Sequence, residues 1–493
     1  MTTTAVQYET IIGLEVHAQL LTRSKMFCPC SASYADSSPN THVCPTCLGM
    51  PGVLPVINKR AVEMTIMTGL ALHSEVPEQA KFDRKNYPYP DLMKGYQISE
   101  FDQPLCTGGW LEIELDGQRK RLGITRVHLE EDTAKLIHVN SPTGETYSLV
   151  DVNRSGVPLM EVVGEPDMHS PEEARAYLVK LRQILRYLDV CAGNMEEGNF
   201  RCDANVSLRP MGASELGSKV EVKNMNSFRS VYRALNHEVE RQREILDNGG
   251  RIPQETRGWV DDQGVTVSQR SKEYANDYRY FPEPDLPPIV VDREWLEKIR
   301  AQMRELPDAK HARFLSEYGL SEYDVSLLIE TPAKADYFEA AVALAPEAKR
   351  QKRAKAAANW INGELAGLLN AHNIGISEAK ITPDALSQLI DLQEDGTISG
   401  KTAKGVFQEM FETGRDPKQI VEGAGLVQIT ASDEIAAAVE RVLENNAKAA
   451  ADYRGGKEEA LKFLVGQVMR ETRGRANVGM VNQLLKENLS GNP

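Results

Sequence analysis

The sequence has no long hydrophobic run. No window approaches the roughly 20 apolar residues that a membrane-spanning helix needs, and the mean hydropathy is −0.40. The first ten residues, MTTTAVQYET, contain neither the basic start nor the apolar segment of a signal peptide. We therefore expect a cytoplasmic protein that does not enter a membrane.

The sequence also has fewer basic than acidic residues. The chain has 57 Lys and Arg against 71 Asp and Glu, a net charge of −14. The molecule as a whole is therefore not attracted to nucleic acid, and any RNA contact must come from a local basic patch. The Walker loop, the kinase glycine loop and the dinucleotide fingerprint are missing as well, so a nucleotide site would have to be of another kind.

Cysteines are few but unevenly spread. Of the seven, Cys28, Cys30, Cys44 and Cys47 lie close together. In a reducing compartment such a group indicates metal rather than disulfides. The C-x-C and C-x2-C pairs can supply four thiolates to one zinc ion, and a full set of four favours a structural role. The alternative is four reduced free thiols.

Length and pattern predict several domains. A chain of 493 residues corresponds to about three domains. Short alternating runs fill residues 1–290, and helical periodicity follows Asp292. Thr382-Pro383-Asp384 and Ser432-Asp433-Glu434 have the composition of helix starts. We expect a β-rich domain at 1–294, a helical domain at 295–408 and a helical tail at 409–493.

Three runs in the first half predict strands with one polar face. Residues 12–20, 202–208 and 219–223 alternate polar and apolar side chains, and successive side chains of a strand point to opposite faces. Glu15, His17 and Gln19 therefore share a face. These could be only the solvated faces of a one-sided sheet, but Glu, His, Asp, Asn and Lys are typical of a metal–nucleotide site.

Acidic residues gather in two further runs, 126–132 and 151–161. Carboxylates beside histidine suit Mg²⁺, which takes oxygen ligands and shares them with phosphates. Surface salt bridging is the alternative. Strict alternation places Glu131 on the face of Val127 and Leu129, with Glu130 on the opposite face.

Basic and aromatic residues alternate in the runs 81–90 and 277–282. Cations among aromatic rings can hold phosphates while bases stack on the rings. Packing of tyrosines in proline-rich loops is the other interpretation. The candidate residues for substrate or ATP contact here are Arg84, Lys85, Tyr87 and Arg279.

The longer motifs resemble one family. Glu15-Val-His17, residues 81–87, VDVNRSGVPLMEVVGEP at 150–166, MEEGNFRCDANVSLRP at 195–210, EVKNMNSF at 221–228 and DYRYFPEPD at 277–285 stand in that family's order. From about residue 8 to about residue 488, the chain closely resembles the B subunit of the bacterial glutamyl-tRNA(Gln)/aspartyl-tRNA(Asn) amidotransferase.

The resemblance implies an α+β fold, with an antiparallel β-rich cradle followed by an all-α helical domain and a YqeY-type tail. It also implies a ligase that uses ATP and Mg²⁺ to phosphorylate the side-chain carboxylate of Glu or Asp misacylated onto tRNA. Ammonia from a glutaminase A subunit would then displace the phosphate, in a complex that also holds a small C subunit.

Residue roles carry over position by position from the same resemblance. Glu15, His17, Glu131 and Glu161 match the catalytic metal cluster, Asp203 and Lys223 a second metal and a phosphate contact, and the four cysteines zinc. The tail would reach along tRNA, and its local positive charge lies in Arg470, Arg473 and Arg475.

Two other functions compete with this interpretation. A non-catalytic, zinc-containing tRNA-binding protein would explain the cysteines and the arginines but not the polar strand faces. An aminoacyl-tRNA synthetase would explain ATP, tRNA and zinc, but its two signature motifs, His-x-Gly-His and Lys-Met-Ser-Lys, are missing. The archaeal relative of the family differs by an inserted domain that is not visible here.

Overall fold

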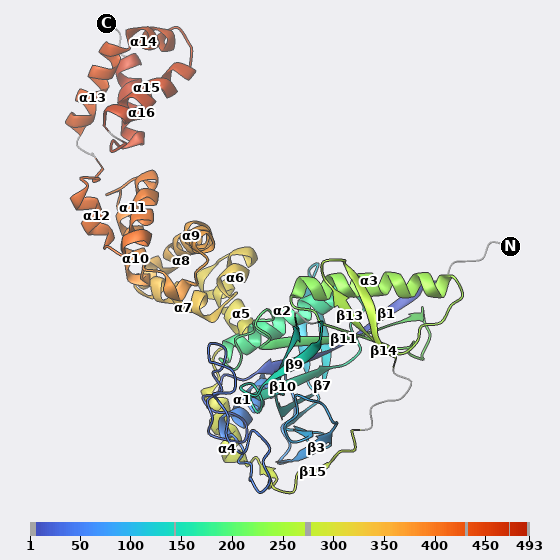
Figure 1. The fold of residues 1–493 in the computed structure, drawn as a ribbon. Helices are drawn as coiled ribbons and strands as arrows, with labels where there is room; N and C mark the ends of the chain where they lie inside the picture. Colours follow the sequence, from blue (N-terminus) through green and yellow to red (C-terminus); the bar gives the residue numbers. More distant parts are fainter. Residues whose placement is uncertain (1–5, 142–143, 272–277, 429–431, 473, 491–493) are drawn as a thin grey trace, which may run out of the picture. The chain divides into compact units, whose positions relative to one another are not determined.

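The computed structural model describes residues 6–141, 144–271, 278–428, 432–472 and 474–490. The chain forms two compact units, Met1–Pro307 and Asp308–Pro493, and each is described separately (Figure 1). Among the described residues, no helix has the length and apolar character needed to cross a membrane.

A twelve-stranded sheet forms the centre of the first unit. Its strand order is β14-β13-β12-β11-β1-β10-β7-β4-β3-β15, and β5 and β6 also pair with β7. All pairs are antiparallel except β12 and β13, which are parallel. The strands are β1 Tyr8–Gln19, β3 Phe82–Asn86, β4 Tyr96–Glu100, β5 Cys106–Thr107, β6 Trp110–Leu115, β7 Gln118–Glu131, β10 Pro158–Gly164, β11 Phe200–Pro210, β12 Val220–Lys223, β13 Glu255–Val260, β14 Val265–Ser271 and β15 Phe281–Pro282.

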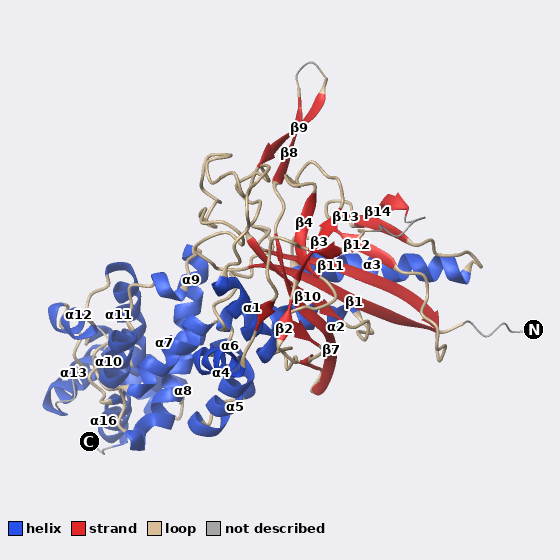
Figure 2. Ribbon diagram, turned by 90° about the horizontal axis from the view of Figure 1, so that it is seen from below, coloured by secondary structure: helices blue, strands red, loops and turns tan. Residues whose placement is uncertain are grey.

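Three helices pack on one face of this sheet, namely α1 (Lys59–Ala71), α2 (Pro171–Tyr187) and α3 (Phe228–Asp247). Ile12, Leu14 and Val16 of β1 are completely buried beneath them. The side chains of Ser170 and Ser227 cap α2 and α3 by accepting backbone N–H bonds, which fixes where each helix begins. Figures 1 and 2 show α2 and α3 running along the strands.

The predicted limit at residue 294 falls inside α4 (Arg293–Gln302), which belongs to the first unit. The indole N–H of Trp295 donates to Glu63 of α1 at 3.1 Å, and the Lys59 ammonium lies 5.3 Å from the indole ring. Just before α4, β16 (Ile289–Val290) pairs with β2 (Gln79–Ala80). The prolines at 287 and 288 prevent a continuous helix here, and the residues after them still belong to the first unit.

Helices build all of the described second unit. The side chain of Thr382 caps α10 as predicted, whereas the predicted limit at 408 falls inside α11. Residues from Ile435 to Leu489 share a separate apolar core. The helices are α5 Pro307–Tyr318, α6 Glu322–Leu328, α7 Pro332–Ala343, η1 Glu347–Lys349, α8 Arg350–Trp360, η2 Ile361–Leu365, α9 Ala366–His372, η3 Ile376–Glu378, α10 Pro383–Glu394, α11 Gly400–Thr413, α12 Pro417–Gly423, α13 Ser432–Asn445, α14 Ala447–Arg454, α15 Glu459–Glu471 and α16 Val478–Ser490.

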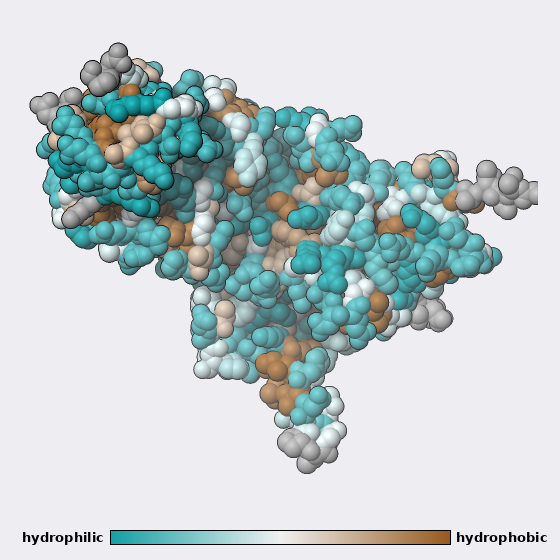
Figure 3. All heavy atoms as spheres, turned by 90° about the horizontal axis from the view of Figure 1, so that it is seen from above, coloured by the Kyte–Doolittle hydropathy of each residue, from teal (hydrophilic) through white to brown (hydrophobic). Residues whose placement is uncertain are grey.

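A two-stranded hairpin projects from the first unit (Figure 2). It consists of β8 (Lys135–Asn140) and β9 (Thr146–Asp151), and Ile137 lies opposite Leu149. Ile137 is 37% exposed and Leu149 52%, and Figure 3 shows apolar residues along this projection. The predicted fold class, an α+β protein with a β-rich first domain and helical later domains, is confirmed.

Candidate active site

The face of the sheet opposite the helices is polar. In the register of β11, β1, β10 and β7, His17 lies between Arg201 and Glu161, and Glu161 lies between His17 and His128. Cross-strand neighbours project to the same face of a sheet. The alternation predicted for β1 therefore places its functional side chains on this face and its apolar side chains under the helices.

His17, Glu130 and Glu161 form the centre of the polar face. Nε2 of His17 lies 3.5 Å from a Glu161 oxygen and 3.8 Å from a Glu130 oxygen. One ligand atom from each of these three residues lies within 4.8 Å of the others. Two carboxylates and an imidazole at such separations can share one cation, and the carboxylate oxygens suit a hard ion such as Mg²⁺.

Opposite charges stabilise this cluster. Burial lowers the pKa of His17, but the charges of Glu161, Glu130 and Asp203 outweigh it and raise that pKa to about 9. Burial likewise raises the pKa of Glu161, whereas the adjacent His17 and His128 lower it well below its usual value. Glu161 therefore remains a carboxylate at neutral pH.

His128 is a fourth member, which the sequence placed in the acidic run 126–132 but did not assign to the metal cluster. It is 2% exposed, and its Nε2 lies 3.3 Å from Glu161. Its position two residues before Glu130 places both on the same face of β7. The alternation of the run 126–132 was the signal that could have identified His128.

Glu131, the residue predicted for the metal cluster, lies elsewhere. Its carboxylate accepts a 2.5 Å hydrogen bond from Lys94 and one from the backbone N–H of Ile98. Because neighbours in a strand face opposite ways, Glu130 takes the place beside His17. The structure thus agrees with strict alternation and separates Glu131 from Glu15, His17 and Glu161.

Further charged pairs line the same face toward β12. Asn205 donates to the Glu15 carboxylate at 2.9 Å. Lys223 lies 2.6 Å from Asp203 and 3.3 Å from Glu221. Glu15 and Asp203 face each other across β1 and β11, so the predicted residues from three strands do come together.

On the other side, β3 brings Lys85 to the polar face. Burial lowers its pKa, but the charges of Glu130, Tyr280 and Glu161 raise it above its ordinary value. The Lys85 ammonium lies 5.1 Å from the Tyr278 ring and 6.0 Å from the Tyr87 ring. The expected combination of a cation with aromatic rings is therefore present beside the carboxylate cluster.

The other two basic candidates of this region are placed differently. Arg84 pairs with Ile98 in the register of β3 and β4, and so lies on the face opposite Lys85. Its guanidinium makes two 2.7 Å hydrogen bonds to Glu283. Arg279 is exposed, and its carbonyl accepts a 3.0 Å bond from Asn86. Arg84 thus acts as the partner of a buried carboxylate.

The four predicted zinc ligands lie together. One sulfur from each of Cys28, Cys30, Cys44 and Cys47 lies within 4.8 Å of the others. The Cys28 thiol, as a hydrogen-bond donor, lowers the pKa of Cys47, so the group readily supplies a thiolate. Four sulfurs in one cluster fit a tetrahedral metal centre.

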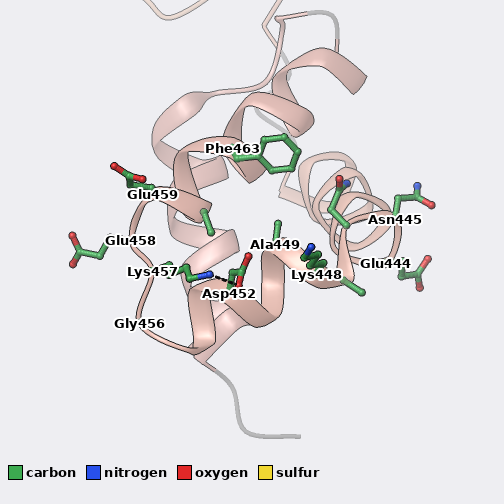
Figure 4. A pocket seen from close by; sticks show the side chains of 13 residues that line it. Glu444, Asn445, Lys448, Ala449, Asp452, Gly456, Lys457, Glu458, Glu459 and Phe463 are labelled. Carbon is green, nitrogen blue, oxygen red and sulfur yellow. Dashed lines mark hydrogen bonds and ion pairs between the residues drawn. The ribbon is translucent and has the colours of Figure 1, made fainter.

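The candidate tRNA contacts lie at the end of α15. Arg470 is exposed in the last turn of this helix, and Arg475 is half-buried just after it, whereas Arg473 lies outside the described residues. A pocket of about 1020 Å³ opens between α13, α14 and α15. Figure 4 shows charged side chains around its rim, including the 2.9 Å pair of Lys457 and Asp452. The residues that line it include lysines and carboxylates but no histidine.

Fold and site together define a class of protein in which a β-rich domain carrying a carboxylate–histidine cluster is followed by a helical region. Known proteins show the same division. Residues 10–297 match the sequence model described as the GatB/GatE catalytic domain, and residues 336–489 match the one described as the GatB domain.

Curated relatives match along nearly the whole chain. The B subunits of the aspartyl/glutamyl-tRNA(Asn/Gln) amidotransferases from Thermomicrobium roseum and Carboxydothermus hydrogenoformans are 58% and 56% identical to it over 484 residues. The B subunit from Dehalococcoides mccartyi strain CBDB1 is 55% identical over 487 residues. Each alignment covers 98% of this chain and 99% of the relative. The chain belongs to this family of amidotransferase B subunits.

Proposed function

We propose that this protein is the kinase and transamidase subunit of a tRNA-dependent amidotransferase, a carbon–nitrogen ligase with glutamine as amide donor. Its substrates would be Glu-tRNA(Gln), Asp-tRNA(Asn) or both, converted to Gln-tRNA(Gln) and Asn-tRNA(Asn). The observation that carries the proposal is the cluster of His17, Glu130 and Glu161, flanked by Lys85 and Lys223, in a chain of this family.

The chemistry explains why such a site is needed. A carboxylate resists attack because its charge repels nucleophiles and an oxide ion is a poor leaving group. Transfer of a phosphoryl group to the carboxylate supplies a good leaving group, and ammonia can then form the amide. Phosphoryl transfer depends mainly on positioning and on neutralising charge, which are tasks suited to fixed carboxylates and lysines.

His17, Glu130 and Glu161 would hold Mg²⁺, with Glu15 and Asp203 beside them for a second ion. Bound Mg²⁺ and ATP would supply the phosphoryl group and spread its charge. Lys85 and Lys223 would hold phosphate oxygens from the two sides of the cluster. Glu131 keeps its bond to Lys94 in this proposal and is not assigned to the metal.

The cysteine cluster would bind a structural Zn²⁺. The four sulfurs fill a tetrahedral shell and leave no open position for substrate. Backbone contacts from this loop support the same view, since the amide of His42 donates to Asn153 at 2.8 Å. The metal would thus stabilise a loop that contacts the segment before β10.

The partners would be a glutaminase A subunit, a small C subunit and misacylated tRNA. Ammonia has to come from another chain, and the relatives bear the name of one subunit among several. Arg470 and Arg475, together with Arg473, would contact the phosphates of tRNA. Phosphate contacts made by a few arginines can bind RNA locally even when the whole chain is acidic.

The decisive experiment is ATP hydrolysis and amidation by the complex reconstituted with its co-purifying subunits. Formation of Gln-tRNA from Glu-tRNA(Gln) with ATP and glutamine is the expected result. Binding of tRNA without ATP turnover would instead support the non-catalytic RNA-binding protein. Glu15→Ala should abolish amidation while glutamine hydrolysis by the partner persists, and near wild-type amidation would remove β1 from the site.

A further inference from the structure

Arg201 of β11 is a cation of the polar face that the proposed function leaves without a role. It lies directly opposite His17 in the register of β1 and β11, so its side chain leaves the sheet beside the carboxylate cluster. Its side chain is 34% exposed. Burial lowers the pKa of its guanidinium, but the charges of Asp132, Glu130 and Asp203 raise it above its ordinary value.

A buried carboxylate fixes this guanidinium in place. Nη2 of Arg201 donates to Asp132 at 3.1 Å, and Asp132 is 3% exposed. Asp132 also accepts hydrogen bonds from Gln19 at 2.7 Å and from the backbone of Thr133 at 2.9 Å. Tyr34 in turn hydrogen-bonds Gln19 at 3.0 Å. Asp132 is therefore itself held by two hydrogen bonds, and Tyr34 fixes the Gln19 side chain that makes one of them.

Two other arginines of the sheet, Arg257 and Arg84, have more of their donors occupied. Arg257 makes three hydrogen bonds to Thr266 and Glu255, and Arg84 is bound in a fork to Glu283. In contrast, the bond to Asp132 is the single hydrogen bond seen for Arg201 within the described residues. A guanidinium has five N–H donors, so Arg201 can bind a further oxyanion at the site.

We propose that Arg201 binds the side-chain carboxylate of the aminoacyl group that the enzyme activates, with Asp132 and Gln19 as positioning residues. This inference rests on the proposed function. The carboxylates of Glu130 and Glu161 would repel an incoming carboxylate, and Arg201 is a cation next to them that can offset this repulsion. Lys85 and Lys223 would still hold the phosphate oxygens of ATP, as in the proposed function.

The same position serves both steps of the reaction. Arg201 holds one carboxylate oxygen while the other attacks the γ-phosphorus of ATP, and the bond to the β-phosphate oxygen breaks so that ADP leaves with the electron pair. Ammonia then adds to the acyl carbon, and phosphate departs as the amide forms and a proton is released. The oxygen held by Arg201 carries the negative charge of the tetrahedral state, where a fixed donor is most effective.

The test compares Arg201→Lys with wild type in the assembled complex. The KM for Glu-tRNA(Gln) should rise at least tenfold, whereas the KM for ATP should change less than threefold. Equilibrium binding should show that the variant loses the preference of the wild type for Glu-tRNA(Gln) over uncharged tRNA(Gln). Arg209→Lys is the matched control, because Arg209 lies on the same face of β11 but is paired with Glu9 at 2.8 Å.

Asp132→Asn provides a second, independent test if Arg201→Lys fails to assemble. Releasing the guanidinium should raise the same KM by a smaller factor and leave the KM for ATP unchanged. The inference is overturned if the KM for ATP rises instead, if both rise equally, or if neither differs from the Arg209→Lys control. A wild-type complex without ATP-dependent amidation would overturn the proposed function, which is a separate outcome.

Discussion

Glu130 and Glu131 are adjacent in the sequence and have different surroundings. Glu130 is 2% exposed and lies beside His17, while Glu131 is bonded to Lys94. We predict that Glu130→Gln lowers ATP-dependent amidation by roughly a thousandfold, as expected for loss of a metal ligand worth several kcal/mol. Glu131→Gln is the control, and amidation by the two reconstituted variants is the measurement. An equal loss in Glu131→Gln would return that residue to the catalytic cluster.

Glu100 gives a second prediction for a single residue. Burial is the largest effect and raises the pKa of Glu100 to about 8. The backbone N–H groups of Leu129 and Leu105 donate to its carboxyl group and lower the pKa, but by less. The folded protein therefore keeps a proton on Glu100 between about pH 4.5 and 8 that the unfolded chain releases. The free energy of unfolding should fall by about 1.4 kcal/mol per pH unit as the pH rises through this window.

Glu100→Gln should abolish this dependence, because glutamine resembles the protonated acid and can still accept both backbone bonds. Denaturant titrations of wild type and variant between pH 5 and pH 9 measure the difference in unfolding free energy. Wild type should be the less stable of the two above pH 8. Parallel pH profiles for both proteins would show that the Glu100 carboxyl is ionised in the folded state.

Among the elements, the cysteine loop is the one whose stability should depend on metal. Cys47→Ser removes one of four sulfurs, so we expect loss of zinc from the purified protein and a lower thermal midpoint, since metal binding adds to folding free energy. Cys191→Ser is the control, because Cys191 is buried outside the cluster. Elemental analysis and thermal unfolding are the measurements. Purified wild type without zinc would contradict the proposal.

The strands also show how far the sequence could predict the site. Period-two alternation correctly predicted the polar faces of β1, β11 and β12, because every second side chain of a half-buried strand faces the core and is apolar. It also predicted that Glu130 and Glu131 point to opposite faces of the sheet, as they do in the structure. Alternation could not show that His17 would lie between Arg201 and Glu161, since pairing between distant strands leaves no local signal.

Domain limits were harder to predict than strands. Composition changes near residue 290, yet Trp295 packs against α1 and keeps α4 in the first unit. The division at 408 falls inside α11, because a helical region gives little local indication of where one core ends and the next begins. The three-domain division stays a prediction, and the separate apolar core of Ile435 to Leu489 supports a distinct tail.

At the scale of the whole molecule, the chain carries a net charge of −14 and is nevertheless proposed to bind tRNA, which is also negatively charged. We predict that Arg470→Ala with Arg475→Ala weakens tRNA binding and reduces the slope of log affinity against log salt by about one to two, because fewer counterions are released. Lys401→Ala with Lys418→Ala removes the same charge from exposed sites on α11 and α12. This control should leave the slope unchanged. An unchanged slope in the arginine variant would place the RNA contact elsewhere, in the first instance at residues 81–89.

The position of β1 has a consequence for the synthesis of the protein. This strand is synthesised before its neighbours in the sheet, since β10 and β11 begin only at Pro158 and Phe200. At a synthesis rate of roughly 5–20 residues per second, β10 and β11 are made on the order of ten seconds after β1. During that time Ile12, Leu14 and Val16, which are buried in the folded protein, lack their partners in the growing chain, so we expect β1 to be open to aggregation until β11 has been made.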